Sequence, residues 1–257
     1  MTRKFYPILA LGFFLAACAS HASADDAKGF RDSFRWIDPA RWYISSGWAN
    51  GSFQSCEWWK GAVAAGDGGM SLRLGTPGGT LRPVSCPEIH TKTHLGYGLF
   101  EARMRTAAGS GLNTAFFTYI GPPTGSPEWN EIDFEFLGKD PHTVQLNYYV
   151  KGKPQLGKII RLGFDASKQF HDYAFDWTPK EIRWYVDGKQ VYATPAGVRL
   201  PYIPAPLYFS LWSGAKSENA WMGPFHYSQP VTATVAWAAY TPIDAPCRFP
   251  QSLKCKK

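Results

Sequence analysis

Negative charge is scarce in this chain. Asp and Glu supply only 20 of the 257 residues, against 27 Lys and Arg, and charged residues of every kind make up 18%. The positive excess forms no basic run except in the C-terminal tail, at Lys254, Lys256 and Lys257, and no nucleic-acid-binding motif accompanies it. We therefore expect no nucleic-acid partner, while the basic balance leaves an acidic polysaccharide open.

Beyond the N-terminal apolar run, helical periodicity is nearly absent, and internal repeats and low-complexity linkers are missing. No Cys-x-x-Cys pair occurs either, so no zinc site is predicted. Short alternating runs at 100–105, 143–149 and 173–177 indicate strands, and Asp187-Gly188 between two further runs indicates a hairpin. Because 45% of the residues are hydrophobic and 16% are aromatic, the chain can fill the space between two sheets. The pattern predicts one all-β sandwich domain.

The N-terminus carries an export signal but no run that could comfortably span a membrane. A positive segment precedes the apolar run 5–17, and two processing sites follow it. A lipoprotein box ends at Cys18, and a small-x-small site ends at Ala24. We predict a signal peptide at 1–24 and one domain at 25–257. Cleavage after Ala24 gives a secreted or periplasmic protein. The alternative is an outer-membrane lipoprotein, and we expect membrane attachment only if Cys18 is lipidated.

The cysteines fit an oxidising compartment. Cys18 leaves the disulfide pool by either processing route, which leaves Cys56, Cys86, Cys247 and Cys255. Four cysteines allow three pairings. The prediction is Cys56–Cys86 and Cys247–Cys255, the second closing a small loop around the basic tail.

Three of the scarce acids stand close together. Glu131, Asp133 and Glu135 alternate with Ile132 and Phe134, which is the period of a strand with one buried face and three acids on the other. Like charges held so close repel unless a proton or a cation is shared, and a shared proton is what acid/base chemistry uses.

Three interpretations of the acids compete. An exposed edge strand would mix Lys, Thr or Ser among them, and a calcium loop would bring Gly, Asn and carbonyls instead of Ile and Phe. A retaining glycosidase needs two carboxyls about 5–5.5 Å apart, as nucleophile and acid/base. On a flat strand the Cα atoms of Glu131 and Glu135 would lie ~13 Å apart, so this third interpretation requires a concave sheet and inward-leaning side chains.

Several segments resemble a known family. EIDFEFLGKD, VQLNYY, LGFDASKQFHDYAFDW, IRWYVDG and SLWSG are similar to the bacterial lichenases, the endo-β-1,3-1,4-glucanases of glycoside hydrolase family 16, over about residues 30–240. The segments GWANG, SCEW, SCPEIHTKTHLGYGLFEARM and GSGLNTAFFTYIGP resemble the branch that trims bacterial exopolysaccharides, the succinoglycan depolymerases. The resemblance implies a concanavalin A-like β-jelly roll of two curved antiparallel sheets, with a concave cleft in which a polysaccharide, a β-glucan, is cut internally with retention.

The resemblance also implies residue roles. Glu131 is expected to be the nucleophile and Glu135 the general acid/base, with Asp133 holding the nucleophile by a hydrogen bond. Cys56–Cys86 matches the family disulfide. The positions that match the substrate cleft are Asn50, Glu88, Phe117, Tyr119, Trp129, Gln145, Asn147, Tyr149, Trp212 and Trp221.

The departures from the family concern specificity and metal. His90 stands where lichenases have Arg, and Ser210 stands where they have Asn, both in the cleft, so the preferred glycan is open. Ala236 replaces the Asp of the family's calcium site, so no metal or other cofactor is predicted, although a structural calcium stays open. We expect a monomer. Rival functions are a transglycosylase of the xyloglucan type and a non-catalytic sugar-binding jelly roll, which would be expected to have lost one acid.

Overall fold

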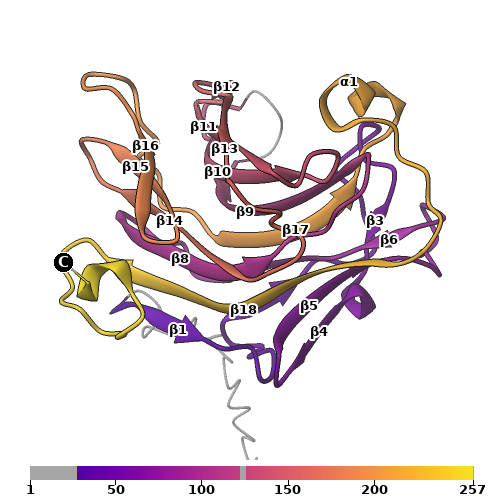
Figure 1. The fold of residues 1–257 in the computed structure, drawn as a ribbon, viewed down its shortest axis with the longest axis horizontal. Coiled ribbons are helices and arrows are strands. Elements are labelled where there is room, and N and C mark those ends of the chain that lie inside the picture. Colours follow the sequence, from indigo (N-terminus) through magenta and orange to yellow (C-terminus); the bar gives the residue numbers. More distant parts are fainter. Residues whose placement is uncertain (1–27, 122–125, 257) are drawn as a thin grey trace, which may run out of the picture.

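The protein consists of two stacked antiparallel sheets. A computed structural model describes residues 28–121 and 126–256 (Figure 1). The predicted signal peptide and Cys18 lie outside the described residues, so both stay predictions. In the described part, no helix is long and apolar enough to cross a membrane.

One sheet, here called the support sheet, has the order β16-β15-β14-β8-β18-β5-β4, with β1 paired to β18. Its strands are β1 (Phe30–Asp32), β4 (Val63–Gly66), β5 (Gly69–Leu74), β8 (Gly98–Arg105), β14 (His171–Trp177), β15 (Ile182–Val186), β16 (Lys189–Ala193) and β18 (Val231–Pro242).

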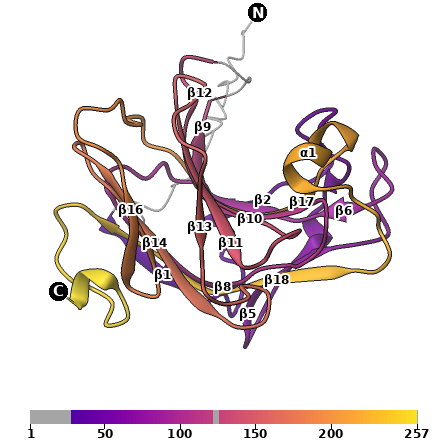
Figure 2. The ribbon, with the colours of Figure 1, turned by 45° about the horizontal axis from the view of Figure 1, so that its top comes forward.

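The other sheet, here called the triad sheet, has the order β12-β11-β10-β9-β17-β7-β2, with β13 paired to β11. Its strands are β2 (Trp42–Ile44), β7 (Glu88–Thr91), β9 (Leu112–Ile120), β10 (Asn130–Leu137), β11 (Thr143–Val150), β12 (Lys153–Pro154), β13 (Lys158–Arg161) and β17 (Leu207–Ser213). Two short strands, β3 (Glu57–Trp58) and β6 (Ser85–Cys86), pair in parallel beside it. Figure 2 shows the two large sheets from a second direction.

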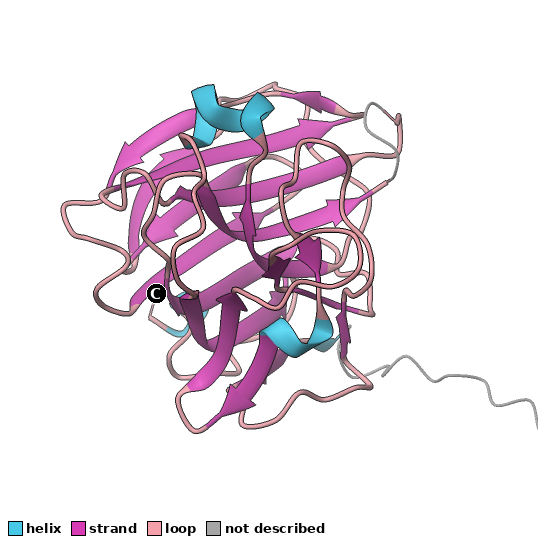
Figure 3. Ribbon diagram, turned by 90° about the vertical axis from the view of Figure 1, so that its right-hand side faces the viewer, coloured by secondary structure: helices cyan, strands magenta, loops and turns pink. Residues whose placement is uncertain are grey.

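The all-β prediction is confirmed, and helices are confined to short turns (Figure 3). The predicted hairpin is present, with positive φ at Asp187 (47°) and Gly188 (79°), which is the conformation that a two-residue type I′ turn requires. The short helices are η2 (Lys60–Ala62), η3 (Lys216–Glu218), α1 (Asn219–Met222) and η4 (Leu253–Cys255). The helix α1 and the C-terminal η4 lie at opposite ends of the molecule (Figure 1).

Stacked phenylalanines fill the space between the sheets. Phe116 packs on Phe134 and Phe209 within the triad sheet, at ring-centroid distances of 5.9 and 5.2 Å, and on Phe175 of the support sheet at 5.2 Å. Each of these rings is fully buried, which stabilises the fold by about 1.5–3 kcal/mol per ring. The packing fixes the register of β10, because a slip by one residue would expose Phe134 and bury the acids.

A buried indole connects the support sheet to the acidic strand. Trp184 on β15 is fully buried, and its Nε1–H donates to the backbone carbonyl of Asp133 at 3.1 Å. This bond crosses the core, so the support sheet helps to hold β10 at the position of the acids.

Both predicted disulfides are confirmed. Cys56–Cys86 joins residues 30 positions apart, and Cys247–Cys255 closes a loop of 8 positions at the C-terminus. The Leu253 amide donates to Glu101 on β8 at 2.8 Å, which docks this C-terminal loop on the support sheet.

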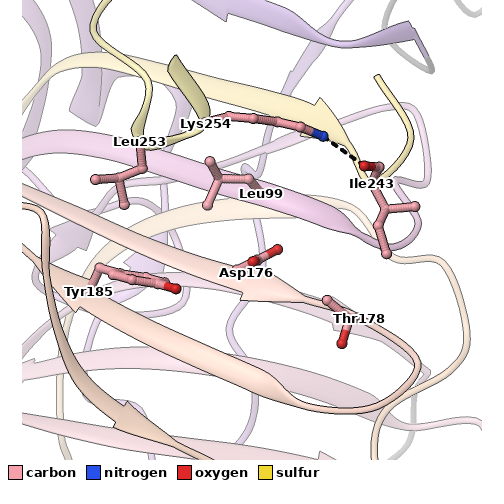
Figure 4. A pocket seen from close by; sticks show the side chains of 7 residues that line it. All are labelled: Leu99, Asp176, Thr178, Tyr185, Ile243, Leu253 and Lys254. Carbon is pink, nitrogen blue, oxygen red and sulfur yellow. Dashed lines mark hydrogen bonds between the residues drawn. The ribbon is translucent and has the colours of Figure 1, made fainter. Parts of the chain in front are cut away.

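A cavity of about 170 Å³ lies beneath the C-terminal loop, against β8, β14 and β15 (Figure 4). The Lys254 ammonium beside it donates to the Ile243 carbonyl at 2.7 Å. Asp176 is the one carboxylate in its lining, so this cavity lacks the pair of acids that the sequence placed on β10.

Candidate active site

The three acids lie on one face of β10, here called the triad face. Ile132 and Phe134 between them are fully buried in the core, as the alternation predicts. Each acid has cross-strand neighbours on both sides. Glu131 lies between Tyr119 and Tyr149, Asp133 between Phe117 and Asn147, and Glu135 between Ala115 and Gln145.

Glu131 accepts hydrogen bonds that favour its ionised form. Burial raises its pKa to about 7, while hydrogen bonds from the Trp129 indole and from Asp133 oppose that rise. The two donors orient the carboxylate and favour its ionised form against the effect of burial. These are the properties that a nucleophile needs.

Asp133 is held in its neutral form. It is 2% exposed, and burial raises its pKa well above the ordinary value, with the charges of Glu131 and Glu135 adding to the effect. The hydrogen bond that it shares with Glu131 requires a proton between them, because two ionised carboxylates are both acceptors. The proton of Asp133 therefore keeps Glu131 ionised.

Glu135 has a different environment. Asn113 Nδ2 donates to one of its oxygens at 3.1 Å, and Gln145 Nε2 donates to the other at 3.3 Å. Gln145 is itself fixed, because its oxygen accepts from the Trp221 indole at 3.0 Å. Burial raises the pKa of Glu135 to about 8, and the charge of Glu131 adds to the rise. The raised pKa favours the protonated form of Glu135, which suits an acid.

Aromatic rings flank both ends of the triad. Near Glu131, the Trp129 ring stacks on Tyr149 at 4.7 Å, and Tyr119 stands edge-on to it at 6.1 Å. Burial raises the pKa of Tyr119 to about 12, and its hydroxyl donates to the Gly121 carbonyl at 2.6 Å. These phenols are neutral donors at physiological pH.

Near Glu135, a second aromatic group lies on the triad face. Trp212, which pairs with Asn113, contacts Trp221 at a ring-centroid distance of 6.1 Å and Phe53 at 5.9 Å. The structure therefore places the predicted residues Trp212 and Trp221 beside the acid/base candidate, with Trp221 reaching it through Gln145.

Glu88 is a fourth acid on this face. It is 5% exposed, and the Ser45 hydroxyl donates to it at 2.6 Å. Burial raises its pKa to about 7. Ser210 lies between Glu88 and Ala115, the neighbour of Glu135, so Glu88 belongs to the same cross-strand row as the acid/base candidate.

Two predicted sugar ligands also have structural partners. The Asn147 oxygen accepts from the amides of Tyr148 and Leu156, at 2.9 and 3.2 Å, so only its NH₂ group is left for a ligand. Asn50 is exposed in the turn before β3, where its oxygen accepts from the Trp58 indole at 3.2 Å.

Sequence reasoning missed Asn113, Tyr208 and Tyr43. Asn113 donates directly to Glu135, and Tyr208 stacks on Phe117 at 4.9 Å. The alternation of side chains along a strand could have identified two of them. Asn113 lies four residues before Phe117 and Tyr208 lies four residues before Trp212, so each shares a strand face with a predicted cleft residue.

Metal ligation has little support on the described residues. Ala236 lies at the register shift of β18 and offers no side-chain ligand, and no group of three His, Cys, Asp or Glu placed to hold a metal occurs in 28–121 or 126–256.

Known proteins share this fold and much of this sequence. Residues 50–239 match Glycosyl hydrolases family 16. Endo-1,3-1,4-beta-glycanase ExoK of Rhizobium meliloti strain 1021 is 40% identical over 229 residues, covering 89% of this chain and 84% of that protein. The Beta-glucanase of Bacillus licheniformis is 37% identical over 242 residues, covering 93% and 97%. The solved structure of a Bacillus licheniformis beta-glucanase superposes with a TM-score of 0.77 at 38% identity, covering 83% of this chain and 97% of that one.

Proposed function

The chain belongs to glycosyl hydrolases family 16, and from that membership we propose that it is a retaining endo-β-glucanase. The predicted family and jelly-roll fold are confirmed by the relatives and by the superposed structure. Its proposed substrates are β-1,3-1,4-glucan or a bacterial exopolysaccharide, cut at internal β-1,4 or β-1,3 linkages. The observation that carries the proposal is geometric: Glu131, Asp133 and Glu135 share one face of β10, and Glu131 and Glu135 have different hydrogen-bond donors.

In the first step, the Glu131 carboxylate attacks the anomeric carbon and forms a glycosyl ester. Glu135 gives its proton to the departing glycosidic oxygen, which leaves as a sugar hydroxyl. Asp133 stabilises the carboxylate of Glu131 until the bond forms, because its proton lies between the two groups.

In the second step, Glu135 acts as a base. It takes a proton from a water molecule, the resulting oxygen attacks the anomeric carbon, and the bond to Glu131 breaks. Glu135 ends protonated and Glu131 ends ionised, which restores the starting state. Two inversions at one carbon give net retention.

The acid and base roles can be separated by the choice of leaving group. A dinitrophenyl β-glucan oligosaccharide needs no proton to leave, so Glu135→Ala should still release dinitrophenol, whereas Glu131→Ala should not. Both variants should lose activity on barley β-glucan, and Glu128→Gln, at an exposed carboxylate, serves as the control. A Glu131→Ala protein with near-normal turnover would refute the proposal.

The preferred polymer is a finer part of the proposal. His90 and Ser210 differ from the lichenase residues at the same positions, and Ser210 is 2% exposed beside Glu88, where a longer side chain would change the local polar contacts. We expect weaker activity on cereal mixed-linkage glucan than on a bacterial β-glucan exopolysaccharide. Combining His90→Arg with Ser210→Asn should bring the values of kcat/KM on the two polymers closer together. A wild type with a higher kcat/KM on lichenan than on the exopolysaccharide would contradict this expected preference.

Export of a monomer completes the proposal. Two disulfides in a chain with a predicted N-terminal export signal are consistent with an oxidising compartment outside the cytoplasm. Secretion, release into the periplasm and lipidation at Cys18 are separated by the mass of the mature protein and by fractionation of the producing cells.

A further inference from the structure

Four rings form a continuous row on the triad face, starting beside Asp133 and ending at the edge strand β2. Tyr43, His90, Tyr208 and Phe117 are cross-strand partners in turn, and Phe117 is the partner of Asp133. Consecutive ring centroids are 5.1, 4.5 and 4.9 Å apart. With strands about 4.8 Å apart, the row extends roughly 19 Å from Asp133.

The rings face the same side as the acids. Their sequence neighbours Ile89 and Phe209 point to the other side and are fully buried in the core. Tyr43 is 46% exposed, and His90 and Tyr208 are half-buried. Because neighbouring rings lie this close at interplanar angles of 42°, 31° and 23°, they largely face one another. The row therefore offers ring edges and the exposed part of Tyr43 to a sugar bound across the strands.

His90 within this row presents an acceptor. Its Nδ1 lies 2.9 Å from the Thr91 carbonyl oxygen, which can only accept, so Nδ1 carries the hydrogen. Burial lowers the pKa of the imidazole, and His94 lowers it further against the opposing effect of the Thr91 carbonyl. The ring is then neutral, and Nε2 has a free lone pair.

The surroundings of the row add negative charge. The charges of Glu88 and Glu131 both act on the Tyr208 phenol, which places it within electrostatic range of two carboxylates. An acidic substituent near Tyr208 would face these charges without a compensating cation from His90.

Building on the proposed function, we infer that Tyr43, His90 and Tyr208 form a specificity subsite for an uncharged pyranose. The ring edges and the exposed part of Tyr43 contact the sugar, and His90 Nε2 accepts a hydrogen from one free hydroxyl. An arginine at this position could only donate hydrogen bonds to the sugar, whereas His90 Nε2 accepts one. A hydroxyl that is acylated or carries a carboxylate cannot donate, and the subsite rejects it.

The test compares two polymers with the same backbone, one of which carries carboxymethyl groups that add negative charge and remove hydroxyl donors. The value of kcat/KM is measured on barley β-glucan and on the same glucan after partial carboxymethylation, with four variants beside the wild type. His90→Arg changes the polarity, and His94→Arg is the matched control, since His94 is exposed and outside the row. His90→Phe keeps a ring without an acceptor, and Tyr43→Ala removes one ring.

The wild type should prefer the unmodified glucan, and His90→Arg should reduce that preference several-fold more than His94→Arg does. Loss of one neutral hydrogen bond corresponds to about a 3- to 10-fold change, so His90→Phe should raise KM on barley β-glucan by that factor with little change in kcat. Tyr43→Ala should raise KM by a few-fold.

Two results would overturn the subsite. One is an equal effect of His90→Arg and His94→Arg on the preference for the unmodified polymer; the other is an unchanged KM in His90→Phe. A wild type that is inactive both on barley β-glucan and on a bacterial β-glucan exopolysaccharide would instead refute the proposed function, and the subsite with it. Thermal melts of each variant show whether a loss reflects unfolding.

Discussion

Glu135 should destabilise the folded protein at alkaline pH, and Glu135→Gln should remove that cost. Burial raises the pKa of Glu135 to about 8, from an ordinary value of 4.5. The folded state therefore binds more protons than the unfolded state between these values, so stability is present at low pH and is lost as pH rises toward 8. At about 1.36 kcal/mol per pH unit, the loss approaches 5 kcal/mol.

The substitution should be accommodated with little new cost. Asn113 donates its amide NH₂ to Glu135, while its own oxygen is buried without a partner. A rotation of that amide lets the oxygen accept from the new side-chain NH₂, which keeps the number of hydrogen bonds. Allowing about 1–2 kcal/mol for imperfect fit, the net gain at pH 8 is about 3 kcal/mol.

The assay is thermal unfolding of wild type and Glu135→Gln at pH 4.5, 6 and 8. For a domain of this size, about 3 kcal/mol corresponds to a Tm increase of roughly 6–12 °C. The Tm increase should appear at pH 8 and vanish near pH 4.5. The control Glu128→Gln, at an exposed carboxylate, should show no Tm increase at any of the three pH values. The same Tm difference at all three pH values would refute the reasoning.

Three further outcomes follow from other parts of the fold. Trp184→Phe removes the buried donor to the Asp133 carbonyl, so it should lower stability by about 1–3 kcal/mol and lower kcat; unchanged kcat in a protein that unfolds earlier would show that the bond does not position the acids. Replacing Cys247 and Cys255 together with Ser opens a loop of 8 positions and should cost about 2.5 kcal/mol with kcat intact, as measured by denaturant unfolding and turnover. Intact mass of the mature protein should correspond to a start after residue 24 and two disulfides; a diacylglycerol increment on Cys18 would establish the lipoprotein route instead.

The sequence predicted those features that depend on local period and residue type. Alternation around Ile132 and Phe134 identified the acidic strand face, and the Asp187-Gly188 turn identified a hairpin, because both are readable from neighbours in the chain. The donors to Glu135 were harder, since Asn113 lies on the adjacent strand and reaches it through cross-strand register.

Two other features depend on contacts between distant segments. The Trp184 bond to the Asp133 carbonyl joins two sheets across 51 positions of sequence. The ring row needs β2, β7 and β17 in register before Tyr43 and Tyr208 come to lie on either side of His90. Neither arrangement has a period or a motif that could indicate it beforehand.

The central claim is that Glu131 and Glu135 perform a two-step displacement on a β-glucan. Proton NMR during the first minutes of hydrolysis of barley β-glucan tests it most directly, because it records the anomer released before mutarotation. The account predicts that the β-anomer of the new reducing end appears first and the α-anomer follows slowly. Initial release of the α-anomer would show a single displacement and would contradict the assignment of Glu131 as nucleophile.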